Sequence, residues 1–268
     1  MSRKLLGILL LGFASGLPYM LVFSTLTAWL RDVGISLTEI GFFAWLVLTY
    51  SLKFLWAPFV DRYSIPGFRV FGKRRGWILF SQLVIFLSLI GMSLIDPLQN
   101  IQLLALLAFS AAFFGSIQDV AVDALRIEIG AAKEQGDLAA SYQFGYRVAI
   151  LVATSMALIF ADLYNWAYVY QLMAFLMLIG SAGALICHEP NNQEIAILRF
   201  DAALFGAAKD FFNRFGLWSA ALLLLIISTY RLTDIVMGPM AMPFYLDLGF
   251  SKTEIGALVK TIALIGSV

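Results

Sequence analysis

Two stretches of this chain, residues 32–41 (DVGISLTEIG) and residues 247–256 (DLGFSKTEIG), are copies of one another. The second begins 215 residues after the first and is identical to it at seven of ten positions. A repeat at this spacing predicts two tandem helical bundles, each too large to be a small repeat motif. Because the sequence ends at Val268, soon after the second copy, we expect a complete first half and only the start of a second.

The composition is that of a membrane protein. Hydrophobic residues make up 61% of the chain, charged residues make up 13%, and the mean hydropathy is +0.88. Water-soluble domains carry about 25% charged residues, so a soluble domain is excluded. The partner that this composition predicts is the lipid bilayer, and we expect no nucleic-acid partner.

Seven apolar runs are long enough to cross a bilayer, because a spanning helix needs about 20 mostly apolar residues. Lipid offers the backbone no hydrogen-bond partners, and the runs are too long for barrel strands of about 10 residues. The predicted fold class is therefore an all-α polytopic membrane protein. The predicted spans are residues 5–30, 39–60, 77–95, 101–125, 138–161, 166–187 and 217–246, and an eighth begins near Glu254.

Basic residues are distributed unevenly between the two ends of these spans. One end holds twelve lysines and arginines, and the other holds only Arg31 and Lys252. Because basic loops remain in the cytoplasm, we expect a cytoplasmic amino terminus. The twelve are Arg3, Lys4, Arg62, Arg69, Lys73, Arg74, Arg75, Arg126, Lys133, Arg199, Lys209 and Arg214.

The longest connection, residues 188–215, is polar at first and then helical in pattern. Phe200, Leu204, Ala208, Phe211 and Phe215 fall on one stripe, as in a helix that lies in the membrane interface. A regulatory or lipid-sensing helix would show the same pattern, but a tether between two bundles is favoured. The predicted domains are a six-helix bundle (1–187), a cytoplasmic amphipathic linker (188–215), and the start of a C-terminal bundle with spans seven and part of eight (216–268).

The repeated stretch itself predicts a tight turn between two helices. Gly34 suits the left-handed conformation that ends a helix, and Ser36 and Glu39 have the spacing of a capping box. The second copy repeats all three residues. The acids could instead bind a substrate, but capping accounts for both the serine and the glutamate, so we interpret the repeats as structural joints.

An acidic and basic cluster occupies the loop between the second and third predicted spans. Asp61-Arg62 is separated by residues 64–71 from the run Gly72-Lys73-Arg74-Arg75. The arrangement resembles, in stretched form, the D-R-x-G-R-R signature of the major facilitator superfamily. Positive-inside charge alone would explain the basic run but not the Asp61-Arg62 pair, so a lock between helix ends is favoured. The predicted cytoplasmic gate consists of Asp61, Arg62, Arg74, Arg75 and Arg126.

The strongest chemical signal lies in the fourth predicted span. Asp119, Asp123 and Arg126 have the spacing of one helix face, with Gln118 beside them. A charge at the centre of a bilayer costs about 3 kcal/mol or more, so this face should look into the bundle or a wet cavity. Arg126 lies near the span end and is assigned to the gate, close to Asp61.

Lys53 and Arg147 lie at a similar depth in spans two and five, so two acids and two bases should converge on the inner half of the first bundle. Such a cluster is either a structural charge network or a site for protons and anionic substrate groups. An acid in apolar surroundings takes up a proton readily unless a base pairs with it. The predicted functional pair is Asp119 with Arg147 or Lys53.

Further charged residues fall in the second half. Arg231 and Asp234 are three residues apart in span seven, and Lys260 lies in span eight. We expect them to face the first bundle across a central cavity, although an intrahelical ion pair would show the same spacing. Residues 16–18 (GLP) and 238–239 (GP) are expected to loosen spans one and seven.

Several stretches together resemble the AmpG muropeptide permease family. The resemblance implies a major facilitator transporter of the bacterial inner membrane, which imports anhydro-muropeptides (GlcNAc-anhydroMurNAc-peptides) with protons for peptidoglycan recycling. Acetyl-CoA transporters share the Gln-Asp-x-x-x-Asp pattern, so transport of acetyl-CoA or another anionic metabolite is the alternative. The stretches are residues 12–18 (GFASGLP), 53–58 (KFLWAP), 61–63 (DRY), 74–77 (RRGW), 118–119 (QD), 123–124 (DA), 145–147 (GYR) and 230–234 (YRLTD).

The length departs from that family, whose members have at least twelve spans. We therefore also consider a non-transporting receptor or scaffold, and one half of a split transporter whose partner is a second-half chain. A membrane enzyme is not expected, because the sequence has no His-Glu-x-x-His, Gly-x-Ser-x-Gly, phosphate-binding glycine loop or cysteine cluster. No catalytic residue, cofactor or metal site is predicted.

Overall fold

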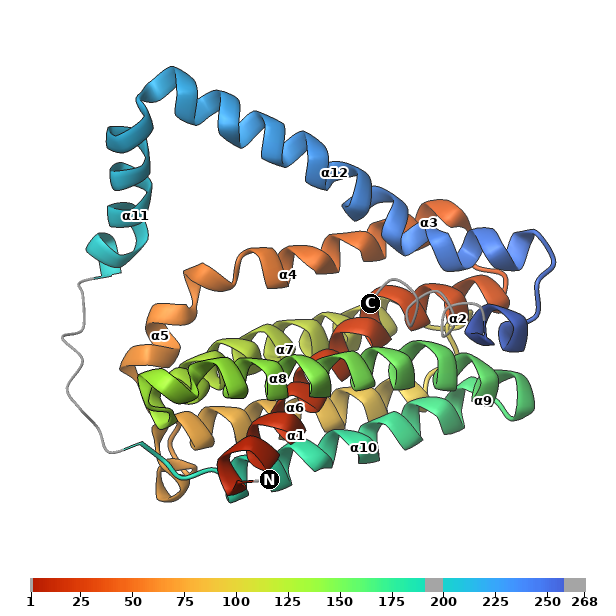
Figure 1. The fold of residues 1–268 in the computed structure, drawn as a ribbon. Coiled ribbons are helices and arrows are strands. Elements are labelled where there is room, and N and C mark those ends of the chain that lie inside the picture. Colours follow the sequence, from red (N-terminus) through yellow and green to blue (C-terminus); the bar gives the residue numbers. More distant parts are fainter. Residues whose placement is uncertain (1, 191–199, 258–268) are drawn as a thin grey trace.

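The computed structural model describes residues 2–190 and 200–257, with side chains described throughout except at 200–205, 207–208 and 231–236. All regular elements in these ranges are helices (Figure 1). Within them, five helical segments are long and apolar enough to cross a bilayer, or up to seven when each of two bent helix pairs counts as one span. The prediction of an all-α polytopic membrane protein is confirmed.

The first half contains six helical rods, in agreement with the six predicted spans. Rod one is α1 (Arg3–Met20), η1 (Leu21–Thr25) and α2 (Leu26–Asp32), and rod two is α3 (Leu37–Phe43), η2 (Ala44–Leu46), α4 (Val47–Ser51), η3 (Lys53–Leu55) and α5 (Ala57–Arg62). After η4 (Arg69–Phe71), rods three and four are α6 (Lys73–Ser93) and α7 (Ile101–Ile129). Rod five is η5 (Ala132–Glu134), α8 (Gln135–Leu151), η6 (Val152–Met156) and α9 (Ala157–Leu163), and rod six is α10 (Trp166–Ile186).

The core of this half is built around α1 and α6. Helix α1 packs against α8 and α10, and α6 packs against α7 and α10. Gly12 and Gly145 allow α1 and α8 to approach closely, because a Cβ atom at Gly145 would collide with the carbonyl oxygen of Leu9 and one at Gly12 with that of Tyr142. Small residues at helix crossings supply close packing in membrane proteins, where hydrophobic burial contributes little to helix association.

The second rod is broken rather than continuous, which differs from the single span predicted. Its two parts, Leu37–Ser51 and Lys53–Arg62, are bent by 40° about Leu52. Pro58 lies in the first turn of α5 and has no N–H, so the helix cannot run regularly through the preceding turn. The break places Lys53 in a short 3₁₀ turn.

The predicted loosening of spans one and seven takes a different form in each. Helix α1 continues through Pro18 and then passes into the π-helical turn η1, and η6 is a second π turn. The Thr25 hydroxyl of η1 donates a hydrogen bond to the Ala153 carbonyl of η6 at 2.5 Å. In contrast, α12 (Leu217–Asp247) is an uninterrupted helix through Pro239 and Pro243.

Both repeated turns have the geometry predicted for them. Gly34 and Gly249 have φ of 90° and 86°, in the left-handed region that favours glycine. In the first copy, the Ser36 hydroxyl accepts from the Glu39 N–H at 3.3 Å, and the Glu39 carboxylate accepts from the Ser36 N–H at 3.2 Å. Ser251 and Glu254 make the same two bonds.

Removing either cap should weaken the turn measurably. Ser36→Ala is expected to lower the free energy of unfolding by about 1 kcal/mol, because an N–H at the start of α3 loses its acceptor. Hydrogen exchange of the Glu39 amide should accelerate accordingly. Thr38→Ala in the same exposed turn is the control, and equal exchange rates in the two variants would contradict the capping role.

The second half begins with a helix pair that leaves the first bundle. Helix α11 (Phe200–Phe215) meets α12 at Gly216, and the flanking parts of the two helices make an angle of 111°. Phe211 and Phe215 of the predicted apolar stripe have ring centroids 5.1 Å apart. Phe200, Leu204 and Ala208 lie outside the described side chains.

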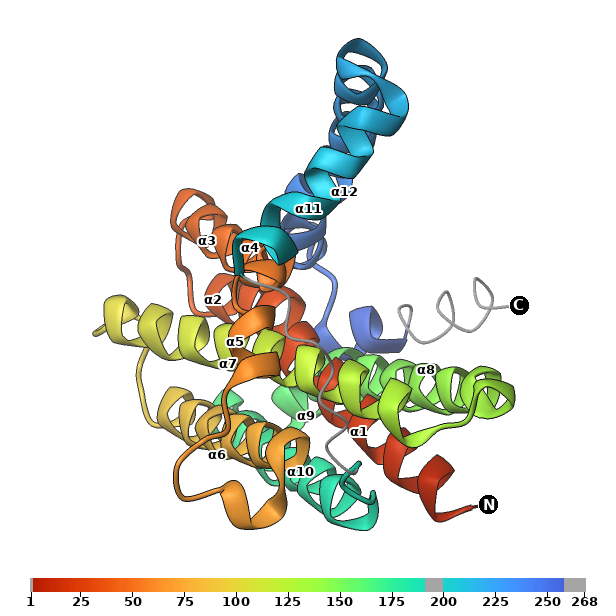
Figure 2. The ribbon, with the colours of Figure 1, turned by 90° about the vertical axis from the view of Figure 1, so that its left-hand side faces the viewer.

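The two ends of the molecule differ in how α12 relates to the bundle. Helix α12 contacts α2 and α3 near its C-terminal end, whereas its N-terminal part and α11 project away from the bundle (Figures 1 and 2). We call the end that carries the amino terminus and residues 62–75 the basic end. The opposite end, which carries both repeated turns, is the repeat end.

Candidate functional site

The centre of the candidate site is the charged face of α7. Asn100 caps this helix by accepting from the Leu103 N–H at 3.1 Å, and the helix then runs without interruption to Ile129. Asp123 and Arg126 lie on one face as predicted, with Arg126 Nη2 3.7 Å from Asp123 Oδ1. The unbroken helix therefore places Asp119 one turn deeper than this pair.

Lys53 reaches this face from the break in the second rod. Its Nζ lies 3.8 Å from Asp123 Oδ2, and each of the two side chains is 42% exposed. Asp123 therefore has a base on either side, Lys53 from η3 and Arg126 from its own helix. An ion pair as open as this one is easily exchanged for contacts with a ligand.

Asp119 is in a different environment from Asp123. It is 8% exposed, and its Oδ1 has no hydrogen-bond partner among the described residues. The groups that act on its carboxyl are Lys53, Ser15 and Asp123, yet no described base lies within ion-pair distance of it. Asp119 is thus a buried acid with a cation nearby but not bound to it.

The structure corrects the predicted pairing of Asp119 with Lys53 or Arg147. Lys53 binds Asp123 instead, and Arg147 is exposed and makes no ion pair with any described residue. Gly145 and Ala149 are buried and mark the face of α8 that packs on the core. Arg147 is two positions from each of them, so it lies about 200° around the helix from that face. The direction of the Arg147 side chain was therefore predicted wrongly, because a position along a span does not fix the rotation about the helix axis.

Tyrosines surround Asp119, and none of them was predicted as a site residue. Tyr50, Tyr142 and Tyr146 all lie within electrostatic range of its carboxyl group. Tyr142 and Tyr146 are one turn apart on α8, with ring centroids separated by 6.1 Å. Gly115 makes room for Tyr50, because a Cβ atom at that position would collide with the tyrosine hydroxyl. The spacing of four residues between two tyrosines in a predicted span was the signal available in the sequence.

Several buried polar atoms in this region have no hydrogen-bond partner among the described residues. The great majority of buried polar groups in proteins are paired, so unpaired ones concentrated near one acid mark a place suited to a ligand or water. Gln118, which is fully buried, has neither amide atom paired. The others in α1, the second rod and α7 are Ser15 Oγ, Tyr50 OH, Trp56 Nε1, Asp119 Oδ1 and Arg126 Nε.

A second cluster lies at the basic end and is centred on Arg74. Arg74 Nη1 is 2.6 Å from Asp61 Oδ1, and its Nη2 is 2.6 Å from Glu128 Oε1. Its Nε also donates to Glu128, at 3.0 Å, so the guanidinium binds that carboxylate through two nitrogens. Arg74 thereby joins the ends of α5, α6 and α7. The predicted contact between Asp61 and Arg74 is present, and its role as a gate stays a prediction.

Other predicted gate residues take different partners. Arg126 binds Asp123 rather than Asp61, because Asp61 is occupied by Arg74. Arg62 lies over the ring of Tyr63 at 5.6 Å. The backbone N–H groups of Arg74 and Arg75 donate to the Glu189 carboxylate at 2.8 and 3.1 Å.

Two acids of this cluster were not predicted. Glu128 lies two residues beyond Arg126, and Glu189 follows α10 and caps the start of α6. An acid at the basic end of a span was the signal for Glu128, whereas no local pattern indicates Glu189. The remaining predicted residues cannot be compared: the side chains of Arg231 and Asp234 and all of Lys260 lie outside the described residues.

The fold and these clusters define a multi-pass helical membrane protein with a charged, partly open site inside its first bundle and a charge network at one end. The sequence matches the family model for the Major Facilitator Superfamily over residues 8–268. It is 35% identical over 263 residues to the anhydromuropeptide permease of Escherichia coli strain K12, covering 97% of this chain and 52% of that protein. The chain belongs to the major facilitator superfamily, in its AmpG group.

Two further relatives carry transporter names. The putative transporter AmpG 4 of Rickettsia felis is 33% identical over 271 residues, which cover 98% of this chain and 65% of that protein. The putative transporter AmpG 1 of Rickettsia bellii is 30% identical over 275 residues, which cover 100% of this chain and 67% of that protein. The chain spans about half to two thirds of the length of these relatives.

Proposed function

We propose that this protein takes part in proton-coupled import of anhydro-muropeptides (GlcNAc-anhydroMurNAc-peptides) across the bacterial inner membrane, as a step in peptidoglycan recycling. The name of the Escherichia coli relative supports the substrate. The observation that carries the proton coupling is the buried Asp119 carboxyl, which has no bound base and lies beside the open Lys53–Asp123 pair. The relatives are named as permeases and transporters, which supports transport rather than catalysis.

Asp119 is proposed to carry the coupling proton. An acid in low-dielectric surroundings without a bound base favours its neutral form, and a base that approaches it favours the charged form. Lys53 is the nearest such base and is already shared with Asp123. When an anionic substrate group takes Lys53, Asp119 keeps its proton. When the substrate leaves, Lys53 returns toward the two acids and the proton is released.

The same region suits a substrate that combines sugars with carboxylates. Tyrosine presents an apolar ring and a polar hydroxyl, which match the C–H faces and hydroxyl groups of a pyranose. Tyr50, Tyr142 and Tyr146 supply three such side chains near Asp119. Lys53, in its open pair with Asp123, supplies positive charge for a carboxylate of the peptide.

The orientation follows from charge. We propose that the basic end faces the cytoplasm, because basic loops remain on that side. Helix α12 lies apart from the bundle at the basic end and contacts it near the repeat end (Figure 1). This arrangement corresponds to a form open to the cytoplasm, in which the Arg74 cluster orders the inner ends of α5, α6 and α7.

The test is uptake of labelled anhydro-muropeptide into vesicles that contain the protein, driven by an imposed pH gradient. One coupled proton and a gradient of one pH unit sustain about tenfold accumulation, because one pH unit is worth about 1.4 kcal/mol per proton, which equals a tenfold concentration ratio. Asp119→Asn is expected to reduce accumulation to simple equilibration while leaving exchange of labelled for unlabelled substrate intact. Asp96→Asn, an exposed acid at the repeat end, is the matched control.

The outcomes separate the classes of function. Absence of both uptake and exchange in the native protein would overturn the proposal for this polypeptide, and binding without uptake would indicate a receptor. Accumulation by Asp119→Asn equal to that of the native protein would remove Asp119 from the coupling. Competition by acetyl-CoA, but not by anhydro-muropeptide, would replace the proposed substrate with the alternative one.

A further inference from the structure

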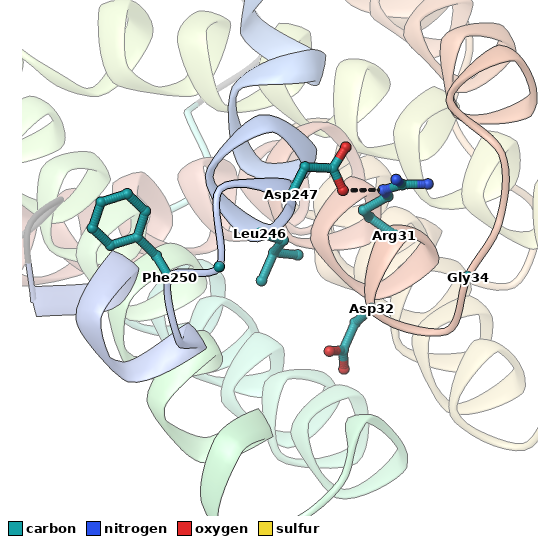
Figure 3. Close-up of a pocket in the computed structure, with 7 residues that line it drawn as sticks. Arg31, Asp32, Gly34, Leu246, Asp247 and Phe250 are labelled. Carbon is teal, nitrogen blue, oxygen red and sulfur yellow. Dashed lines mark hydrogen bonds and ion pairs between the residues drawn. The ribbon is translucent and has the colours of Figure 1, made fainter.

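The two repeated turns contact each other at the repeat end. Arg31 directly precedes the first copy, and Asp247 is the first residue of the second copy. Arg31 Nε lies 2.5 Å from Asp247 Oδ1. Lys252 Nζ of the second copy lies 2.9 Å from Oδ2 of Asp32, the first residue of the first copy. Figure 3 shows Arg31 and Asp247 pointing toward one another across the space between the two turns. Sequence segments more than 200 residues apart are thus joined by two ion pairs.

The pairing is reciprocal and requires both copies. Asp32 and Asp247 occupy the same position of the repeat. Asp32 binds Lys252 of the second copy, and Asp247 binds Arg31, which directly precedes the first copy. The bases themselves are not repeated, because the residue equivalent to Arg31 is Leu246 and the residue equivalent to Lys252 is Leu37. The capping box explains the repeated serine and glutamate but leaves the repeated aspartate without a role. The cross-copy ion pairs supply that role.

The distribution of basic residues supports the same conclusion. Arg31 and Lys252 are the two basic residues that the connections contribute at the repeat end, against twelve at the basic end. Both are used in contacts between the two copies. The basic residues of the connections at this end therefore serve the contact between the turns.

Neighbouring elements extend this contact to the rest of the first bundle. Trp166 Nε1 donates to Asp32 Oδ2 at 2.7 Å, and Lys252 Nζ lies 5.7 Å from the centre of the same indole ring. The Thr253 N–H and hydroxyl donate to Asp162 Oδ2 at 3.2 and 2.7 Å. The second turn thus contacts the ends of α2, α9 and α10.

The contact is built so that it can separate. The Arg31 and Asp247 side chains are 29% and 36% exposed, and ion pairs with this access to water contribute little stability each. A cavity of about 460 Å³ remains between the turns, lined by Arg31, Asp32, Leu246, Asp247 and Phe250 together with the two turn glycines. Charged contacts and this open space lie between the turns themselves, whereas Met242, Leu246 and Ile255 beside them pack against the apolar core of the first bundle.

We propose that Arg31, Asp32, Asp247 and Lys252 form a gate at the repeat end, held shut by ion pairs between the two copies of the repeated turn. Opening requires both pairs to break and also requires α12 to leave its apolar contacts with α2, η1 and α3 at the repeat end. If the proposed function holds, this opening provides the outward step of transport, so that part of the inference rests on the proposed function. The ion-paired gate itself does not, because its state is measured without a substrate.

The experiment uses the reactivity of an introduced thiol. Cys187 is the only cysteine in the chain, so Cys187→Ser gives a background free of thiols. Met242 of α12 is 7% exposed and lies one turn and a half before Asp247 along the helix, so Met242→Cys places a thiol behind the closed gate. Its labelling by a membrane-impermeant maleimide, added from the repeat end, reports opening of the gate in vesicles without substrate.

Charge reversal gives the decisive comparison. Arg31→Asp and Asp247→Arg should each raise the labelling rate by about fivefold, because each places like charges at the contact. The double variant, which restores an ion pair in swapped order, should label at nearly the starting rate. Asp96→Lys, a charge reversal outside the gate at the same end, should leave the rate unchanged.

Correct folding of the variants is checked separately from opening of the gate, and each outcome either supports or overturns the proposed gate. Each variant is checked for its thermal unfolding midpoint in detergent, and Lys252→Gln provides a milder loss of the second pair, with a smaller rise in labelling. Unchanged labelling in the folded single variants, or a double variant that labels as fast as the singles, would overturn the gate. Absence of substrate uptake by the native protein would overturn the proposed function but would not affect the labelling result.

Discussion

Gly145→Leu is expected to prevent assembly of the first bundle. A Cβ atom at this position would collide with the carbonyl oxygen of Leu9, and the nearest atoms are all backbone atoms of α1. Backbone atoms cannot move aside as a flexible side chain can, so α1 and α8 must separate. The expected loss is about 3 kcal/mol or more, at the upper end of what overpacking costs. We expect it to appear as a lower yield of folded protein and a lower thermal unfolding midpoint in detergent.

The control for this variant lies on the same helix. Gly136 is also part of α8, and a Cβ atom there would meet nothing within 4 Å. Gly136→Leu should therefore leave the unfolding midpoint nearly unchanged or raise it slightly, because leucine has the higher helix propensity. Equal midpoints for the two leucine variants would show that close approach of α1 and α8 does not limit stability.

Arg74→Gln is expected to produce the second large effect, at the basic end. The Arg74 side chain is 7% exposed and binds both Asp61 and Glu128, whose side chains are 51% and 22% exposed. Removing the arginine leaves two acids facing one another without their shared cation. Most of the cost arises at Glu128, because Asp61 is open to water. We expect a loss of about 2 to 3 kcal/mol, less than for a fully buried pair.

The measurement is the unfolding midpoint together with proteolysis of the loop at residues 62–73, which should become faster. Arg74→Lys keeps the charge but cannot bind Glu128 through two nitrogens, so it should recover only part of the loss. Arg69→Gln, at an exposed arginine in the same loop that makes no described ion pair, is the control. An effect of Arg69→Gln as large as that of Arg74→Gln would mean that net positive charge, and not the network, is responsible.

Features set by neighbouring residues were predicted well. The left-handed glycines, both capping boxes and the shared face of Asp123 and Arg126 depend on spacings of three or four residues. The spans were predicted because a bilayer demands long apolar helices. The interruption of the second rod was missed, since hydropathy does not reveal the effect of Pro58 on the preceding turn.

Partners of charged side chains were predicted less well. Lys53 and Arg147 were grouped with Asp119 by depth alone, but contact also depends on rotation about each helix axis. Lys53 binds Asp123, and Arg147 is turned away from the core. Glu189 could not have been foreseen, because only the return of the chain after α10 brings it to the start of α6.

The sequence alone determined the helical membrane fold, its two copies of one turn, and the charged face of α7, because each follows from hydropathy or from short spacings along one helix. The tertiary structure decided which charges meet. Ion pairs such as Arg31–Asp247 and Asp32–Lys252 join residues that are far apart in the chain. Their formation depends on how the rods are rotated and packed, and no local pattern fixes that rotation.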